Sequence, residues 1–178
     1  MEIAILSDTH VPAQEQRIPD EFREYIQKTD HVIHAGDFGS NEALADVREL
    51  TSELTAVYGN ADPSDIDLPP VASVEVEGVT FVVVHGIVNP VERAVRSSEG
   101  VVFDRDDWLD AIADTTQARA DEPMVGIGGH SHEVEDTVHV GIRILNPGSA
   151  TGVGEDVDAT MMTAEVVDSD LDVTVHEA

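Results

Sequence analysis

Seven residues of the kinds that bind divalent metal ions occur in short polar motifs along the chain. They are Asp8 and His10, then Asp37, Asn60 and His85, and finally His130 and His132. Hard divalent ions take carboxylate oxygens and imidazole nitrogens as ligands. Seven such ligands are too many for one ion, so the sequence predicts a two-metal hydrolytic site.

The spacing within the motifs indicates how these side chains could converge. Asp8 and His10 are two residues apart, as are His130 and His132, and residues at this spacing share a face while the backbone is extended. Asp37 is the candidate bridge between two ions, because the two oxygens of a carboxylate can point to different centres. Glycines precede Asp37, Asn60 and His130, where they permit tight turns and close backbone approach to ions or phosphate.

The elements that must position these residues follow from apolar patterning. Short apolar runs at 3–7, 31–35 and 54–58 predict buried strands that deliver polar motifs at their carboxyl ends. Helical spacing predicts a helix between each pair of runs. The apolar positions are Ile18, Phe22, Tyr25 and Ile26, with Pro19 in the first turn, and then Leu44, Val47 and Leu50. The first third of the chain therefore predicts a β-α-β-α-β series.

The rest of the chain favours antiparallel hairpins. Alternation over 71–85 predicts a hairpin turning at Glu77-Gly78, and the segment from 134 to 145 predicts another turning near 139–141. A final hairpin over 161–175 is expected to complete a second sheet. A helix should begin near Asp104, and residues 124–127 should form a strand, whereas 88–100 has no clear assignment and 152–158 is a loop. The buried face of that helix should comprise Trp108, Leu109, Ile112 and Ala113. We expect one mixed α/β domain over residues 1–178.

The chain is strongly acidic, with 37 Asp and Glu against nine Lys and Arg, for a formal net charge of −28. Such a chain offers no basic surface for stable nucleic-acid binding. Because the acidic residues are spread along the whole length, we interpret them as a solvated surface of the halophilic kind, whose self-repulsion is screened by salt. Stability should therefore rise with salt.

The same residues bear on compartment and partners. Cysteine is absent, which excludes disulfides, thiolate metal sites and a cysteine nucleophile. The first residues lack the basic start and long apolar stretch of a secretion signal, and the longest apolar run, 79–84, is too short to cross a bilayer. We expect a cytoplasmic protein without membrane contact, and leave homo-oligomer formation open.

The order and spelling of six motifs resembles the calcineurin-like metallophosphoesterase superfamily, and more closely its small YfcE-like branch of bacterial and archaeal phosphodiesterases. The motifs are Ser7-Asp8-Thr9-His10, His34-Ala35-Gly36-Asp37, Gly59-Asn60-Ala61-Asp62, His85-Gly86, Gly129-His130-Ser131-His132 and Asn146-Pro147-Gly148-Ser149. Each motif is weak alone, but six in register over nearly the entire chain are strong. The resemblance implies a sandwich of two mixed sheets flanked by helices, with four layers in the order α-β-β-α.

The resemblance also implies the ligand sets. One metal would be held by Asp8, His10, Asp37 and His132, and the other by Asp37, Asn60, His85 and His130. Two ions about 3.5 to 4 Å apart would clamp a phosphoryl group and supply a metal-bound hydroxide for attack without a covalent intermediate. Within this set Asp37, Asn60 and His85 are the predicted catalytic residues. Manganese is the favoured metal, and nickel, iron or zinc also suit the ligands.

Two positions depart from the pattern of the superfamily. Many larger members carry His after the Gly-Asn pair, where it can protonate the leaving group; this chain has Ala61, and the small branch also tends to lack that His. The small branch commonly reads His-Gly-His at the fifth motif, whereas Ile87 follows Gly86 here. General acid catalysis is worth about 10² to 10⁴ in rate. We therefore expect aryl phosphodiesters to be turned over better than alkyl ones.

Several further polar residues have simpler interpretations. The isolated histidines His31, His139 and His176 are expected to be core or surface residues rather than ligands. In so acidic a chain, Asp62 and Asp65 are expected to be solvated carboxylates.

Two features are left open, and one pair is assigned to packing. His34 is either a packing residue or a partner that orients Asp37. The motif Asn146-Pro147-Gly148-Ser149 is either a Pro-Gly turn or a lining of the site. Met161 and Met162 are expected to pack within a strand rather than bind a soft metal.

The sequence thus predicts metal-dependent hydrolysis of a small or nucleotide-like phosphodiester. The alternative from another class is a non-catalytic protein-binding scaffold, because the same fold is used in a retromer subunit that lacks a fully functional metal centre. Retention of all seven ligand-type residues argues against it. A phosphomonoesterase or phosphoprotein phosphatase is a further alternative, whereas a repair nuclease would need a cationic track that this chain lacks.

Overall fold

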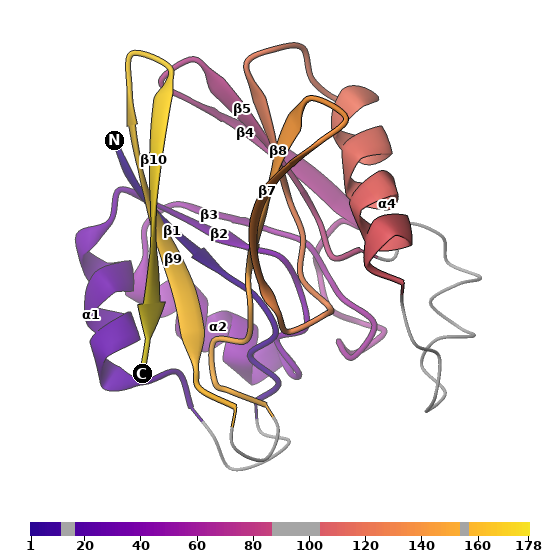
Figure 1. Cartoon of the computed structure of the whole chain (residues 1–178). Coiled ribbons are helices and arrows are strands. Elements are labelled where there is room, and N and C mark those ends of the chain that lie inside the picture. Colours follow the sequence, from indigo (N-terminus) through magenta and orange to yellow (C-terminus); the bar gives the residue numbers. More distant parts are fainter. Residues whose placement is uncertain (12–16, 87–103, 154–156) are drawn as a thin grey trace.

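The computed structural model describes residues 1–11, 17–86, 104–153 and 157–178, which contain two five-stranded sheets packed face to face (Figure 1). Ile87, the segment 88–100 and part of the expected loop at 152–158 lie outside the described residues. Among the described residues, no helix combines the length and the hydropathy that a bilayer span requires.

The first sheet has the strand order β10-β9-β1-β2-β3. Its strands are β1 (Glu2–Leu6), β2 (His31–His34), β3 (Leu54–Ala56), β9 (Thr160–Val167) and β10 (Asp170–Glu177). The first three run parallel and are joined through α1 (Asp20–Lys28) and α2 (Asn41–Leu50), as the predicted β-α-β-α-β series requires. Side chains of α1 and α2, including Phe22 and Leu44, bury the outer face of this sheet against Leu6 and Val32.

The second sheet has the order β4-β5-β6-β8-β7. Its strands are β4 (Val71–Val76), β5 (Val79–Val84), β6 (Met124–Ile127), β7 (Val134–His139) and β8 (Ile142–Pro147), with α4 (Arg105–Gln117) between β5 and β6. Both predicted hairpins are present, and Glu77 and Gly78 take the positive φ values that a tight two-residue turn needs. The predicted apolar face of α4, including Trp108 and Ile112, is buried on this sheet.

Local signals set where the helices begin. Ser40 caps α2 by accepting a hydrogen bond from the backbone N–H of Ala43, and Asp104 caps α4 by accepting one from Asp106. Pro19 stands at the cap position immediately before α1 rather than inside its first turn. Proline suits the cap position as well as the first turn, because neither position needs a backbone N–H donor.

The placement of the last hairpin was predicted wrongly. It does not complete the second sheet; β9 pairs antiparallel with β1 and so lies inside the first sheet. The strand β9 is covered on both faces, as its two methionines show. Met161 packs on the side of the helices and Met162 on the side of the opposite sheet, and both are fully buried. Their expected role in strand packing is confirmed.

The core between the sheets combines side chains of both, among them Ile3 and Ile5 from β1 and Phe81 and Val83 from β5. Figure 1 shows α1 and α2 outside the first sheet and α4 outside the second. The order of layers is therefore α-β-β-α, which confirms the expected fold class.

Candidate metal centre

The seven predicted ligands lie together at the carboxyl ends of the strands. Asp8 and His10 follow β1, Asp37 follows β2, Asn60 follows β3, His85 follows β5, and His130 and His132 follow β6. Since parallel strands of both sheets end at the same edge of the sandwich, residues far apart in the sequence meet there. The expectation that these residues follow the carboxyl ends of strands is confirmed.

The side chains form two groups. Asp8, His10 and His132 have potential ligand atoms within 4.8 Å of one another, and the same holds for Asp37, His85 and His130. Asn60 joins the second group, because its Oδ1 lies 3.1 Å from Nε2 of His85 and 2.9 Å from Nδ1 of His130. Nε2 atoms of His10 and His132 are 3.2 Å apart in the first group. We call these the first and the second ligand group.

Asp37 lies between the two groups. Its Oδ2 is 3.2 Å from Nε2 of His85 in the second group and 3.5 Å from Nε2 of His10 in the first. The expected bridging position of Asp37 is thus compatible with the geometry.

The backbone around the ligands is coiled rather than extended. Five of the seven ligands have φ between 47° and 74°, in the left-handed region: Asp8, His10, Asp37, His130 and His132. The expectation that extended backbone aligns Asp8 with His10 and His130 with His132 is therefore wrong, because the strands end before these pairs begin. Non-glycine residues adopt this conformation at a cost of order 1–3 kcal/mol each, and such residues cluster at functional sites.

One buried carboxylate oxygen fits a cation. Oδ2 of Asp8 accepts hydrogen bonds from the Ser7 hydroxyl and from the backbone N–H of His130, the latter at 2.9 Å. Oδ1 accepts none, and it is the one buried side-chain polar atom without a hydrogen bond in the described part of the chain. It faces Nε2 of His132 at 3.2 Å and Nε2 of His10 at 3.5 Å. A buried oxygen that accepts no hydrogen bond, beside two imidazole nitrogens, is a set of donors that suits a divalent ion.

The electrostatics point the same way. Burial would raise the pKa of Asp8, but His10 and His132 hold it well below its usual range. Burial would likewise lower the pKa of His85, but Asp37 and Asp8 outweigh that effect and raise it to about 10. Burial and the nearby His85 lower the pKa of His130 to about 4, which leaves that imidazole neutral. The buried carboxylates therefore attract positive charge to this site.

Two glycines allow the loops to approach one another closely. A Cβ on Gly59 would lie 2.1 Å from Oδ1 of Asp37, and one on Gly129 would lie 2.0 Å from the Ser7 hydroxyl and 2.7 Å from Oδ2 of Asp8. The predicted close backbone approach is thus present, and the groups approached include the carboxylates of the site.

Asp62 departs from expectation. It is not solvated but 6% exposed, and its carboxylate accepts three backbone hydrogen bonds, from Asp37, Gly39 and Gly59. Burial raises its pKa, and these hydrogen bonds oppose the rise. Its place in the motif Gly59-Asn60-Ala61-Asp62 could have indicated a role at the site. That signal was obscured by the many other acidic residues of the chain. Asp65 is exposed, as expected.

His34 supports the site from behind. Its Nδ1 accepts a hydrogen bond from the backbone N–H of Gly36 at 3.2 Å, which leaves Nε2–H to donate to the Thr9 hydroxyl at 3.1 Å. Its ring stacks on Phe38 with centroids 3.7 Å apart. Burial lowers the pKa of His34 to about 3, so it is neutral. It therefore stabilises the turn before Asp37 rather than contacting the Asp37 carboxylate.

The motif at 146–149 is more than a turn. The Asn146 side-chain amide donates to the Ser131 hydroxyl at 2.9 Å and to the backbone carbonyl of Gly129 at 3.3 Å. Ser149 donates to the backbone carbonyl of Asp8 at 2.8 Å. Thr151, which no sequence pattern singled out, donates to that of Thr9 at 2.8 Å. These side chains hold the backbone of the ligand-bearing loops.

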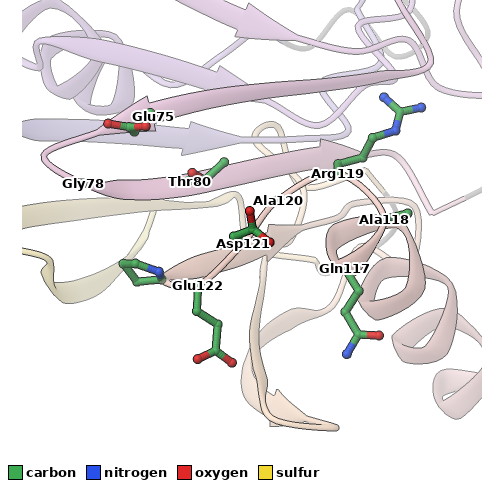
Figure 2. A pocket seen from close by; sticks show the side chains of 10 residues that line it. Glu75, Gly78, Thr80, Gln117, Ala118, Arg119, Ala120, Asp121 and Glu122 are labelled. Atoms are coloured by element: carbon green, nitrogen blue, oxygen red, sulfur yellow. The ribbon is translucent and has the colours of Figure 1, made fainter.

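The other features lie away from the ligands. His31, His139 and His176 pair with Thr55, Asp110 and Thr163 respectively. A cavity of about 550 Å³ lies at the other end of β6, lined by the β4–β5 hairpin and the segment between α4 and β6 (Figure 2). Glu75, Arg119, Asp121 and Glu122 are among the residues that line it, and no predicted ligand is among them.

Comparison with known proteins gives the relationship of the chain. The sequence pattern of the calcineurin-like phosphoesterase superfamily domain matches residues 1–169. A probable metallophosphoesterase of Methanothermobacter thermautotrophicus is 28% identical over 185 positions, which cover 98% of this chain and 91% of that protein.

Solved structures show the same fold. Vps29 of Entamoeba histolytica, complexed with zinc, superposes with a TM-score of 0.72 at 22% identity and covers 100% of this chain and 98% of its own. A structure described as a novel archaeal phosphodiesterase superposes with a TM-score of 0.62 at 23% identity, covering 99% of this chain and 100% of its own.

Proposed function

Since the chain belongs to the calcineurin-like phosphoesterase superfamily, we propose that it hydrolyses small or nucleotide-like phosphodiesters with the help of two divalent metal ions. The observation that carries this proposal is the buried Oδ1 of Asp8, which accepts no hydrogen bond and faces the imidazoles of His10 and His132. A protein whose only role there was structural would have little reason to keep an unpaired buried carboxylate oxygen.

The ligand groups suggest how two ions would be held. Asp8, His10, Asp37 and His132 would bind one ion, and Asp37, Asn60, His85 and His130 the other. Bound there, the ions would act as Lewis acids that activate water and neutralise charge on the phosphoryl group. The donor set of oxygen and nitrogen suits manganese first, and also nickel, iron or zinc.

The residues of the chain supply orientation. Nδ1 of His85 donates to the backbone carbonyl of Ala35 at 2.7 Å, which directs Nε2 towards Asp37 and Asn60. The Asn60 side chain meets both His85 and His130, so it links the two imidazoles of the second ligand group. These contacts support the catalytic assignment of Asp37, Asn60 and His85.

The residue at position 61 bears on substrate preference. Ala61 is exposed beside Asn60 and carries no group that could protonate a leaving group. Diesters whose leaving group departs unaided are therefore favoured, and the acidic surface disfavours nucleic-acid polymers. We also assign the chain to the small YfcE-like branch. We treat residues 1–178 as one domain, and the core shared by both sheets supports the single domain.

A protein-binding scaffold is the second candidate function. Val138 and Val140, at the turn between β7 and β8, are 68% and 65% exposed, and exposed apolar residues that cluster can mark an interaction site. Two valines make a small patch, whereas the ligand groups are complete, so hydrolysis is the better supported function.

The test is hydrolysis of bis(p-nitrophenyl) phosphate, and of p-nitrophenyl phosphate, by protein stripped of metal and re-supplied with manganese or nickel in molar salt. Metal-dependent diester turnover that is lost in Asp37→Asn is expected. Faster turnover of the monoester would identify a phosphomonoesterase. No turnover of either ester with both ions bound would contradict the proposal for these substrates and favour the scaffold.

A further inference from the structure

The carboxylate of Asp62 connects two loops that carry predicted ligands. Its Oδ2 accepts hydrogen bonds from the backbone N–H of Asp37 at 2.9 Å and of Gly59 at 2.8 Å. Its Oδ1 accepts one from the backbone N–H of Gly39 at 3.0 Å. The first and third donors belong to the loop after β2, and the second belongs to the loop that carries Asn60. A single side chain therefore ties the positions of both loops.

The loop after β2 is shaped to receive an anion. Gly36, Asp37 and Gly39 have φ values of 98°, 59° and 93°. Backbone of this kind turns successive N–H groups inwards and forms a concave anion-binding nest. Here the anion is the carboxylate of Asp62, whose charge strengthens each of the three hydrogen bonds.

Packing alone does not explain why a carboxylate is buried at position 62. Asp62 is 6% exposed and lies close to the buried carboxylate of Asp37, whose negative charge opposes a second one nearby. Burying a charge is costly unless hydrogen bonds compensate it. Loss of the carboxylate would leave the buried N–H groups of Asp37 and Gly59, and the part-buried N–H group of Gly39, without this acceptor.

The loops it joins are in direct contact. The backbone N–H of Ala61 donates to Oδ1 of Asp37 at 2.7 Å, and Gly59 lies so close that a Cβ there would meet the same oxygen. A small separation of the loops would therefore move the Asp37 carboxylate relative to Asn60.

We propose that Asp62 is a positioning residue, which holds the Asp37 loop against the Asn60 loop and thereby sets how tightly the second ligand group binds its metal. The proposal rests on the proposed function insofar as that group binds a metal. The first ion would depend less on Asp62, because three of its four proposed ligands, Asp8, His10 and His132, stand on the loops after β1 and β6, and it shares Asp37 alone with the loop after β2. Removal of such supporting partners typically weakens metal binding about 10- to 100-fold.

The test compares Asp62→Asn with Asp65→Asn. Asn keeps the size of Asp62 but brings an amide N–H₂ towards backbone donors. Asp65 lies three residues along the same segment, is exposed, and accepts a hydrogen bond from the Asn41 side chain at 3.3 Å. Both variants are titrated with manganese by calorimetry, and their thermal unfolding is measured without metal. The amide proton shifts of Asp37, Gly39 and Gly59 are recorded in metal-free protein.

The expected result is unequal for the two ions. In Asp62→Asn, one manganese should bind about 10- to 100-fold more weakly and the other should lose less affinity, because Asp37 is the one ligand of the first ion that stands on a loop held by Asp62. The three amide protons should shift upfield. Asp65→Asn should match the parent. Equal weakening of both ions, or unchanged binding of both, would overturn the proposal. If Asp62→Asn does not fold, Asp62→Glu, which keeps the charge, is measured instead and judged by the same criteria.

Failure of the proposed function would look different. A parent protein that binds metal at both groups but hydrolyses no ester would leave the titration and the amide shifts intact as tests of Asp62. Unaltered amide shifts in Asp62→Asn would refute the clamp itself, whatever the activity.

Discussion

The backbone N–H of Ala61 donates a hydrogen bond to Oδ1 of Asp37 at 2.7 Å. That oxygen is therefore engaged, and Oδ2 alone faces His10 of the first ligand group and His85 of the second. The sequence argument expects the two oxygens of Asp37 to point to different centres; in the structure one oxygen faces both. Ala61, which stands where many larger members of the superfamily carry histidine, thus contributes through its backbone N–H.

Asp37→Asn should abolish diester hydrolysis, with a loss of at least about 100-fold, because the change removes charge from the carboxylate that faces both ligand groups. Manganese titration should show weaker binding of both ions. Asp110→Asn, on the surface of α4 where Asp110 pairs with His139, is the matched control and should retain activity. Turnover of the Asp37 variant at the parental rate would refute the central position of this residue.

Ala61→His should raise the hydrolysis of alkyl phosphodiesters more than that of aryl ones. The parent has no general acid at this exposed position, so its rate should fall steeply as the pKa of the leaving group rises. An imidazole at position 61 should flatten that dependence, whereas Ala61→Gln, of similar size but without a transferable proton, should not. The measurement is the rate of the chemical step across diesters that differ only in leaving group; equal rates in the parent would contradict the prediction.

His34 should make the metal-free protein less stable in acid. The folded protein keeps this buried imidazole neutral, with a pKa of about 3 against 6.5 in the unfolded chain. The unfolded chain therefore binds the extra proton first, so stability present above about pH 6.5 is lost as the pH falls towards 3, by at most about 1.4 kcal/mol per pH unit.

Denaturant unfolding of metal-free protein at pH 7 and pH 5 measures this effect. His34→Gln, which can retain one donor and one acceptor, should show a smaller loss between the two pH values than the parent. His139→Gln, at a surface pair with Asp110, serves as the control and should keep the parental loss. An identical loss in His34→Gln and the parent would assign the acid sensitivity to other groups.

Salt should stabilise the protein through its charge. With a net charge of −28, repulsion among acidic side chains opposes the folded state, and molar salt shortens the screening length to about 3 Å. The unfolding temperature should therefore rise between 0.1 and 2 M potassium chloride. Sucrose at equal osmolality separates screening from general exclusion of solute; an equal rise in sucrose would argue against the electrostatic explanation and the halophilic interpretation.

Much of the site could be predicted because its signals are local. Each ligand stands in a short motif after an apolar run, so strand ends and ligand types can both be recognised in the sequence. The left-handed conformation of Asp8 and His10 could not be recognised, since spacing does not reveal where a strand stops being extended.

The burial of Asp62 escaped prediction for a different reason. In a chain with 37 acidic residues, a carboxylate is ordinarily solvated, and only the convergence of three N–H groups from two separate loops makes this one an exception. The pairing of β9 with β1 was hidden similarly, because both sheets offer an apolar inner face to the same core. Such features depend on contacts between distant segments, which a linear pattern does not encode.

The pairing of β1 with β9 also governs the order in which the protein can assemble. The amino group of Met1 meets the carbonyl of Val166, 165 residues away, and every contact along this strand pair closes a loop of similar length. Closing long loops is entropically slow, so the first sheet should be completed late in folding. Until then the apolar strand β1 has an unpaired edge on which another chain could dock, and aggregation should compete with refolding as protein concentration rises.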